Sequence, residues 1–385
     1  MTERTVLISG AGIAGATLAY WLARRGFEPT VVERATGLRS SGSPIDVRGP
    51  AVDLADRMGI MQRIRGAGTS VTEMSFVNGA GRRVGHVNGL AMRRAAGSRG
   101  VELPRADLAA ILLEAGRDSA EIIFGETITG LRQDQDGVEV TFQDAPPGRF
   151  DLVIGADGLH STVRRLVFGP ESAFVKHMGV YVATVPLDAP SLRPTDVVMY
   201  NTPGRSVTIH PGRGRAIAAF IYRGPEVEGF DYRDMDGHKA LLAEAYRDQG
   251  WRVPELLERV RTADDLYFDS VSQVRLPHWS HGRVAVVGDA ASCVSLFGDG
   301  STLAMVGAHT LAEELAANPD DPAAAFQSYE SRHRKLVEPR QRYTRIAPTM
   351  LVPASRPGIA VRNSATRLWP VVAATGWLTR QLAGR

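Results

Sequence analysis

Three glycines near the start of the chain are spaced in a way that suits a bound dinucleotide. Residues 10–15 read Gly-Ala-Gly-Ile-Ala-Gly, after an apolar run at 5–9 and before an apolar stretch at 14–25. In a strand–turn–helix unit, Gly10 allows the tight turn, Gly12 lets a pyrophosphate approach the backbone, and Gly15 lets the helix pack close to the strand. The helix N-terminus, which includes Ala14, offers N–H groups and a positive dipole to the phosphates.

An acidic residue follows at the distance that such a unit requires. Glu33 comes 18 residues after Gly15, at the end of a second predicted strand at 30–33. A carboxylate at this place accepts hydrogen bonds from a ribose diol. The pattern therefore predicts dinucleotide binding, against the alternative of a glycine turn followed by a surface glutamate. On this evidence the ligand could be NAD, NADP or FAD.

Two later motifs narrow this choice. Residues 151–164 read DLVIGADGLHSTVR, and residues 283–300 read RVAVVGDAASCVSLFGDG. With the glycine turn, they resemble the three fingerprints of the single-component FAD-dependent aromatic hydroxylases, in the same order and over about residues 5–320. The middle motif matches at Ala156, Asp157, Gly158, Ser161, Val163 and Arg164. Within that family the layout most resembles the tetracycline-inactivating monooxygenases and actinobacterial relatives of similar length.

The resemblance implies a flavoprotein monooxygenase. In such enzymes NAD(P)H reduces FAD, O2 adds at flavin C4a, and the hydroperoxide delivers one oxygen atom to an electron-rich carbon of an aromatic or polycyclic small molecule. The cofactor performs this chemistry while the protein orients it and excludes water, so we single out no side chain as catalytic. Because the chain has one dinucleotide fingerprint, we expect NAD(P)H to bind without a domain of its own.

The resemblance also implies a set of cofactor-binding residues. Asp289 is expected at the ribitol and diphosphate of FAD, Arg105 at the cofactor, Asp46 facing the flavin, and Arg39 at NADPH. Asp157 is expected both to support the fold and to contact the cofactor. The full expected set is Gly10, Gly12, Ala14, Gly15, Glu33, Arg34, Arg39, Asp46, Arg105, Thr127, Asp157, Asp289, Gly298 and Gly300. The alternatives are a helix N-cap for Asp289, a solvated helix start for Arg105, and ordinary loop charges for Asp46 and Arg39.

The third motif departs from the family pattern. Ser292 replaces the usual histidine, Leu296 replaces a proline, and Asp299 stands where the family has glutamine or methionine. An inward Asp299 would repel the negative charge of reduced flavin. Either Asp299 points to solvent, which we favour, or this flavin is harder to reduce. The loop motivates a rival function, an FAD-binding cyclase or rearrangement enzyme that is not an oxygenase. A second rival is an inactive flavin- or ligand-binding protein.

The rest of the chain predicts an α/β fold. We expect helices at 51–64, 107–115, 239–249, 254–261 and 301–317, and strands at 138–142, 151–155 and 284–288. Residues 180–222 are β-rich and punctuated by proline and glycine, which indicates an inserted antiparallel sheet. We therefore expect a Rossmann-like FAD-binding domain at 1–75, 100–175 and 270–330. A substrate-binding domain would comprise 76–99 and 176–269, and a C-terminal helical segment 331–385.

Composition excludes several classes of protein. Of the 385 residues, 44% are hydrophobic and 23% are charged, which excludes disordered and fibrous chains. A lone cysteine, Cys293, excludes a disulfide scaffold and suits the cytoplasm. Residues 331–385 hold 11 Arg or Lys and one acid, which we interpret as a helical segment against an acidic body. We expect no nucleic acid, membrane or metal partner, and a monomer or weak homodimer. His177 and His210 are candidates for proton handling near the substrate.

Overall fold

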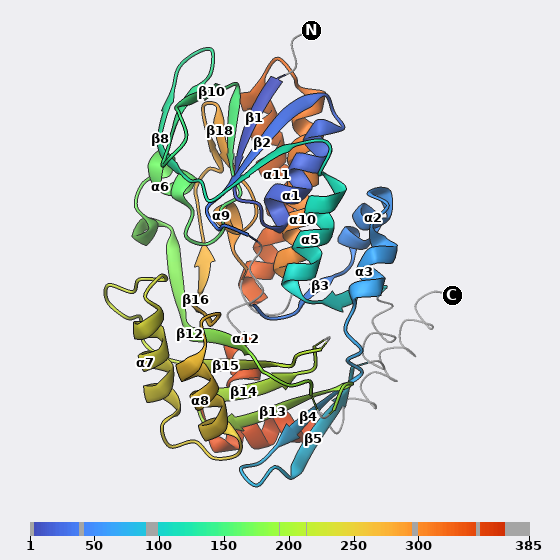
Figure 1. Ribbon diagram of the computed structural model, residues 1–385, viewed down its shortest axis with the longest axis vertical. Helices are drawn as coiled ribbons and strands as arrows, with labels where there is room; N and C mark the ends of the chain where they lie inside the picture. Colours follow the sequence, from blue (N-terminus) through green and yellow to red (C-terminus); the bar gives the residue numbers. More distant parts are fainter. Residues whose placement is uncertain are drawn as a thin grey trace.

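Two sheets of different construction form the two halves of the molecule (Figure 1). The computed structural model describes residues 4–37, 42–89, 99–191, 193–212, 214–294, 299–343 and 347–365. Within this part of the chain, no helix is both long enough and apolar enough to cross a membrane.

The first sheet has six strands in the order β17-β18-β11-β1-β2-β7. Its strands are β1 (Arg4–Ser9), β2 (Phe27–Glu33), β7 (Glu121–Phe124), β11 (Leu152–Gly155), β17 (Ser280–His281) and β18 (Val284–Val286). All neighbours are parallel except β17 and β18. Val6, Leu7 and Ile8 are fully buried, because a parallel sheet is covered on both faces and its strands are apolar throughout.

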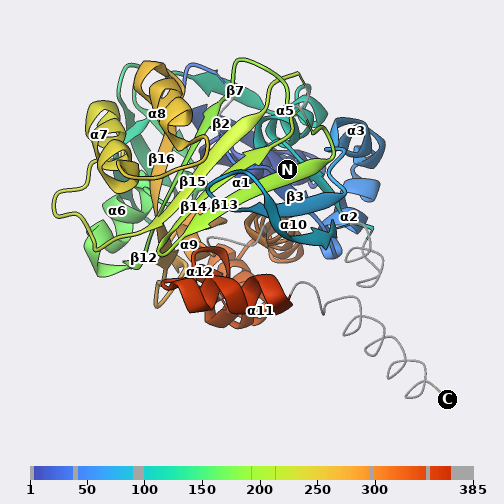
Figure 2. The same ribbon diagram turned by 90° about the horizontal axis from the view of Figure 1, so that it is seen from below.

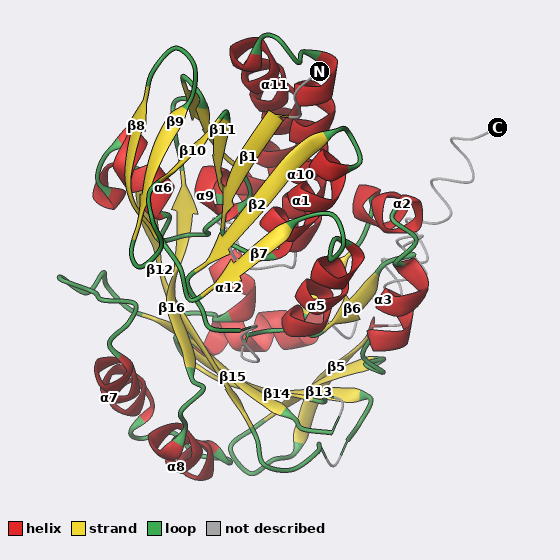
Figure 3. Cartoon of the chain, turned by 45° about the horizontal axis from the view of Figure 1, so that its top comes forward, coloured by secondary structure: helices red, strands yellow, loops and turns green. Residues whose placement is uncertain are grey.

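Helices cover one face of this sheet and a small sheet lies against the other (Figure 3). The helices are α1 (Ile13–Ala23), α5 (Arg105–Ala115), α10 (Asp299–Ala317) and α11 (Pro322–Tyr343). The small sheet has the order β10-β9-β8, with β8 (Ile128–Gln133), β9 (Val138–Phe142) and β10 (Gly148–Phe150). Helix α1 packs against α10 and α5 as well as the sheet, so ten of its eleven residues are buried.

Shorter elements complete this half. They are β3 (Ile45–Val47), which pairs with β6 (Val101–Leu103), then α2 (Pro50–Arg57), α3 (Met61–Ala67), α6 (Thr162–Phe168), the 3-10 turn η1 (Glu171–Ala173) and α9 (Asp289–Ser292). The helix predicted over 51–64 is wrong, because the chain breaks it into α2 and α3 at Gly59. That residue has φ +72°, which a helix does not accommodate.

The second sheet has seven strands in the order β16-β12-β15-β14-β13-β4-β5. They are β4 (Glu73–Val77), β5 (Arg83–Asn88), β12 (Val175–Pro186), β13 (Asp196–Thr202), β14 (Arg205–His210), β15 (Ile217–Arg223) and β16 (Tyr267–Val274). The pairing is antiparallel except between β13 and β4. The antiparallel sheet predicted over 180–222 is therefore confirmed. Its segment begins earlier, at Val175 of β12, and the sheet also includes β4, β5 and β16.

Helices cover one face of the second sheet. Helices α7 (Met235–Tyr246) and α8 (Val253–Thr262) share a core with alternate residues of β14 and β15, such as Val207 and Phe220. Helix α12 (Ala347–Leu351) lies across the sheet from them (Figure 2). The long strands β12 and β16 run from the first half into the second (Figure 1). The opposite face of the second sheet therefore faces the first half.

Candidate functional site

The turn between β1 and α1 uses its three glycines in different ways. Gly10 has φ +105°, and a Cβ there would lie 2.6 Å from the carbonyl oxygen of Ala156. A Cβ at Gly15 would lie 1.9 Å from the carbonyl oxygen of Gly10. By contrast, a Cβ at Gly12 would meet no atom of the described chain within 4 Å. Packing therefore requires Gly10 and Gly15, whereas Gly12 leaves space open in front of the helix.

The start of α1 suits an anion. Gly12 is its N-cap, and no side chain caps the helix there. The first N–H groups of a helix have no partner within it, and its dipole is positive at this end. The space left by Gly12 and the uncapped helix together fit a diphosphate.

Glu33 lies beside this turn at the end of β2. One carboxylate oxygen accepts a hydrogen bond from the N–H of Ala11 and the other from the N–H of Ala35, both at 2.9 Å. These bonds hold the carboxylate in place, and each oxygen keeps capacity for another donor. Thr127 lies at the same end of the sheet, because the N–H of Glu126 donates to the carbonyl oxygen of Glu33 at 3.1 Å.

Arg105 and Asp289 meet although they are far apart in sequence. The Nη2 atom of Arg105, at the start of α5, lies 4.0 Å from Oδ2 of Asp289, at the start of α9. A Cβ at Gly288 would lie 2.8 Å from the Cβ of Ala14, so α9 begins against the start of α1. The side chains of Arg105 and Asp289 keep 50% and 33% of their surface exposed and can contact a ligand beside the glycine turn.

Asp299 is held by two arginines. Nε and Nη2 of Arg48 donate to its Oδ1 at 3.1 and 2.9 Å, and Nε of Arg340 lies 3.5 Å from its Oδ2. Nη1 of Arg48 also lies 3.7 Å from Oδ2 of Asp46. The expected solvent-facing Asp299 is therefore wrong, as is an unpaired inward one. Two guanidinium groups balance the two carboxylates at the start of α10.

The start of α10 is also bonded to β3. The hydroxyl of Ser301 donates to the carbonyl oxygen of Asp46 at 2.6 Å, and the N–H of Arg48 donates to the hydroxyl of Thr302 at 3.3 Å. Gly300 lies in the first turn of α10. Arg39 and Gly298, both expected at the cofactor, lie outside the described residues.

Asp157 is turned into the protein. Its carboxylate accepts hydrogen bonds from the hydroxyl of Ser161, from the N–H of Val163 at 3.0 Å and from the hydroxyl of Ser9 at 3.4 Å. Burial raises its pKa, although these bonds favour the charged form. The structure thus gives Asp157 the supporting part of its expected role, joining the end of β1 to the start of α6.

Arg34 points toward the second half of the molecule. Its Nη1 donates to the hydroxyl of Tyr232 at 2.5 Å, and Nε of Arg233 donates to the same hydroxyl at 3.1 Å. The Tyr232 ring stacks on His160, with ring centres 4.0 Å apart. Arg34, expected at the cofactor, thus links the two halves through Tyr232. His160 stands in the ADGLHSTVR motif, but nothing local indicates its partner Tyr232.

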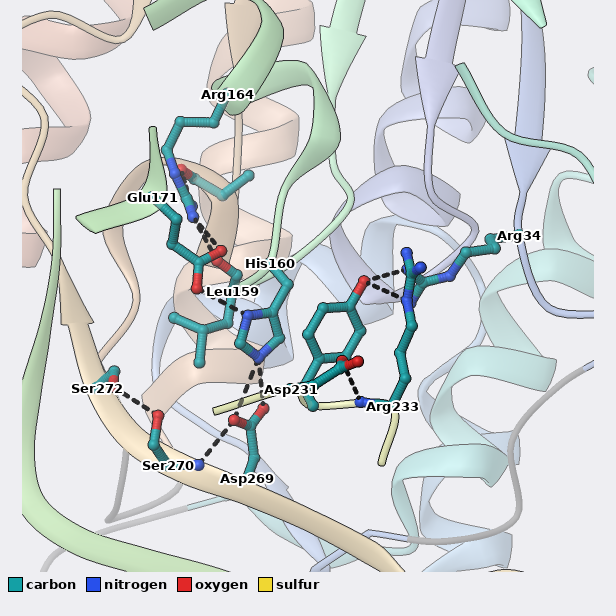
Figure 4. A network of polar contacts seen from close by, with 12 residues as sticks. Arg34, Leu159, His160, Arg164, Glu171, Asp231, Arg233, Asp269, Ser270 and Ser272 are labelled. Atoms are coloured by element: carbon teal, nitrogen blue, oxygen red, sulfur yellow. Dashed lines mark hydrogen bonds and ion pairs between the residues drawn. The ribbon is translucent and has the colours of Figure 1, made fainter. Parts of the chain in front are cut away.

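His160 is held between two carboxylates (Figure 4). Its Nδ1 lies 2.9 Å from Oε1 of Glu171, and its Nε2 lies 3.2 Å from Oδ1 of Asp269 on β16. On the far side of Glu171, the fully buried Arg164 lies 3.4 Å from its Oε2. Burial favours the neutral imidazole, but the bonds to Asp269 and Glu171 outweigh it and raise the pKa of His160 to about 9.

We expect this network to make stability depend on alkaline pH. Because the folded pKa of His160 lies above its unfolded value of about 6.5, its contribution is complete below that pH. It is lost as the pH rises through about 9. The contribution should be of the order of 3.5 kcal/mol, because the pKa rises by about 2.5 and each pKa unit corresponds to about 1.4 kcal/mol. The Tm of His160→Gln should therefore be lower than wild type at pH 6 and approach it above pH 9.

The matched control for this pH dependence of Tm is His278→Gln, because His278 is exposed. A gap in Tm between wild type and His160→Gln that does not narrow with rising pH would contradict the account.

A row of side chains crosses the open face of the second sheet. The strand register aligns Phe76, Met199, Thr208, Ala219, Thr184 and Tyr267. Helices α7 and α8 cover the other face, and Asp269, on the same face as this row, reaches His160 of the first half. We call this surface the open sheet face because α7 and α8 do not cover it. It faces the first half, and most residues of the row are buried.

Polar atoms on the open sheet face are buried without partners. Among the described residues, Thr184 Oγ1, Asn201 Oδ1, Ser206 Oγ and His210 Nδ1 make no hydrogen bond. Burial lowers the pKa of His210 to about 4, so this imidazole is neutral at pH 7. Nε2 of His177 lies 3.2 Å from the carbonyl oxygen of Gly224, while its Nδ1 is also buried without a hydrogen bond. Buried polar atoms normally find partners, so the first four atoms suit a polar ligand.

Tyr267 stands at one end of the row, on β16 opposite Thr184. Burial raises the pKa of its hydroxyl, and Asp269 raises it further. Tyr267, Arg48 and Arg340 were not singled out from the sequence. Arg48 could have been noticed two residues after Asp46, but Arg340 carries no local signal.

Comparison with known proteins agrees with this geometry. A family model described as an FAD binding domain matches residues 3–340. The uncharacterised protein Rv1260 of Mycobacterium tuberculosis is 41% identical over 353 residues, which cover 88% of this chain and 92% of that protein. A flavin-dependent monooxygenase of Legionella longbeachae is 34% identical over 344 residues, covering 88% and 87%. The solved structure of the tetracycline destructase Tet(51) has a TM-score of 0.83 and 32% identity, covering 97% of this chain and 98% of that one.

Proposed function

The chain belongs to the FAD-binding family of flavin-dependent monooxygenases, and on that premise we propose that it uses NAD(P)H and O2 to hydroxylate an aromatic or polycyclic small molecule. When bound, FAD supplies the redox chemistry and the activation of oxygen. The chain's own residues bind and orient the cofactor and substrate and keep water away from both.

The cofactor site rests on the space in front of α1. The N–H groups at the start of α1 would bind the diphosphate, with Glu33 at the adenosine ribose. Arg105 and Asp289, placed beside the same turn, would bind the diphosphate and the ribityl hydroxyls. The start of α10 and Asp46 would approach the flavin ring, with Arg48 and Arg340 balancing the charge of Asp299.

The open sheet face would hold the substrate. It combines apolar side chains such as Met199 and Phe76 with the unpartnered hydroxyls of Thr184 and Ser206. Apolar surface with a few polar groups is typical of sites for small molecules. The neutral imidazole of His210 could exchange a proton with a substrate hydroxyl at the edge of this face.

The open space at Gly12, beside an uncapped helix and the Arg105–Asp289 pair, is the observation that carries the proposal. The purified protein should be yellow and release FAD, not FMN, on denaturation. In anaerobic stopped flow NADPH should bleach the flavin, and admitting O2 with tetracycline should give a product heavier by one oxygen atom. Tetracycline is a suitable first probe because the chain is similar to a tetracycline destructase.

The same experiment separates the rival functions. A protein that binds FAD but whose flavin neither NADPH nor NADH reduces would be a non-oxygenase or an inactive binding protein. A colourless protein that cannot be reconstituted with FAD would overturn the cofactor assignment. The departing loop at 294–300 motivated the non-oxygenase rival, and one part of that departure, the charge of Asp299, is balanced by its ion pairs with Arg48 and Arg340.

We expect Arg105→Ala and Asp289→Ala each to weaken FAD binding by about 10- to 150-fold. Each change removes a charge-assisted hydrogen bond worth roughly 1.5–3 kcal/mol. The dissociation constant of FAD can be measured by fluorescence quenching during reconstitution of the apoprotein. The exposed Arg117, on the same segment as Arg105, is the matched control. Unchanged FAD affinity in both variants would refute their placement at the cofactor.

A further inference from the structure

Arg362 lies over the open sheet face in an unusual setting. It belongs to the helical segment 356–365, and its guanidinium carbon lies 4.3 Å from the centre of the Phe76 ring. Its Nη1 lies 3.9 Å from Sδ of Met199 and 3.4 Å from the carbonyl oxygen of Met350, and its Nη2 donates to Oδ1 of Asn363 at 2.8 Å. Every one of these neighbours is uncharged.

The cation therefore has no counter-ion within the described chain. None of the ion pairs there includes Arg362, whose neighbours are a ring, a thioether, a carbonyl and an amide. Burial lowers its pKa to about 10, so the group stays charged at neutral pH while losing part of its hydration. A partly desolvated charge is costly unless an opposite charge meets it.

The position of Arg362 relates it to the substrate surface. Phe76 and Met199 are neighbours in the row that continues through Thr208 on the open sheet face. Asn201 follows Met199 by two residues on β13, so it lies on the same face, and its Oδ1 is one of the atoms without a partner there. The guanidinium thus lies at one end of this surface. Asp269, which contacts His160, stands on β16 at the other end, and the row between them is apolar or neutral.

We propose that Arg362 binds an anionic oxygen group of the aromatic substrate, either a carboxylate or an ionised enol or phenol. The planar fork of a guanidinium matches such oxygens with two parallel hydrogen bonds. The ring system would then lie over Phe76 and Met199, with its other oxygen groups toward the hydroxyls of the sheet. This inference deepens the proposed function and rests on the open sheet face being the substrate site.

The test compares aromatic acids with their neutral carboxamides. Benzoate, naphthoate and anthracene carboxylate, each beside its amide, are titrated into the FAD-loaded enzyme by calorimetry. The best-binding acid should bind the wild type at least about 10-fold more tightly than its amide, as expected for a charge-assisted hydrogen bond. Arg362→Gln should lose this preference while binding the amide within about twofold of wild type, and Arg362→Lys should restore part of it.

Arg356 provides the matched control, because it is an exposed arginine on the same helical segment. Arg356→Gln should keep the full preference for the acid, and the Tm of each variant checks folding. The proposal is overturned if no acid of the series binds, if the wild type binds an amide as tightly as its acid, or if Arg362→Gln keeps the preference.

The ionised enol is tested separately with tetracycline, which carries an ionised enol at neutral pH. Its binding to the wild type and to the same variants is compared. Arg362→Gln should bind it at least about 10-fold more weakly than wild type, and equal binding would exclude the enol. FAD content and reduction by NADPH are measured on the same preparations. If NADPH does not reduce the flavin but the wild type still prefers anions, the result counts against the oxygenase function alone. If NADPH reduces the flavin normally but the wild type shows no preference for anions, the result counts against the role of Arg362 alone.

Discussion

Replacing Gly12 with valine is expected to give a folded protein that does not retain FAD. Gly12 has φ −71° and ψ −170°, which a valine adopts without strain, and its missing Cβ faces open space. A valine there would occupy the space proposed for the diphosphate. Loss of two or more charge-assisted hydrogen bonds, at roughly 1.5–3 kcal/mol each, should weaken FAD binding by at least about 100-fold.

Two further glycines make this experiment specific. Gly66 in α3 also has open space at its Cβ position, so Gly66→Val controls for the substitution itself and should retain FAD. Gly15→Ala should destabilise the fold, because its Cβ would lie 1.9 Å from the carbonyl oxygen of Gly10. The FAD-to-protein ratio and the Tm of the apoprotein distinguish the two failures. A yellow Gly12→Val protein with normal FAD affinity would refute the proposed diphosphate site.

Neutralising Asp299 is expected to raise the reduction potential of the bound flavin. Asp299→Asn removes a negative charge and leaves Arg48 and Arg340 without their shared partner. Two unit charges about 6 Å apart interact by about 3 kcal/mol at an effective dielectric constant of about 20. For a two-electron couple this corresponds to about 60 mV, at about 30 mV per 1.4 kcal/mol. Reduction by NADPH should become faster.

Removing a positive charge near Asp299 should lower the reduction potential of the flavin. Arg48→Met leaves Asp299 with Arg340 alone and should lower the potential, while the double variant should return toward wild type. The exposed Asp118, substituted in the same way as Asp299, controls for a general change in net charge and should leave the potential unchanged. Spectroscopic titration against a reference dye measures each value. A potential that falls in Asp299→Asn would contradict this electrostatic account.

Much of the fold can be predicted from local patterns. The buried strands at 5–9 and 151–155 are uniformly apolar, and each precedes a glycine or small-residue turn, as β1 and β11 do in the structure. The stretch from 180 to 222 is β-rich and punctuated by proline and glycine, which is typical of an antiparallel sheet. The break at Gly59 was missed because a single glycine within a helical pattern does not show in advance whether its φ will be positive.

The glycine turn between β1 and α1 could be predicted from local sequence alone. The tight turn needs a positive φ, and the close helix and the open space each need a residue without a Cβ. All three needs are met by glycines within a few residues of Gly12. The partners of the charged residues were decided only by tertiary structure. Asp299 meets Arg48 and Arg340 because α10, β3 and α11 pack together, and no local pattern records which segments will pack.

The same limit explains the substrate surface and the link between the halves. Which residues of the second sheet face the first half depends on where α7 and α8 pack, so Thr184, Ser206 and Tyr267 had no local signal. Tyr232 reaches His160 and Arg34 only because a loop after β15 folds against the first half. Backbone demands are local and can be read in sequence, whereas charge pairing and burial depend on contacts between distant segments.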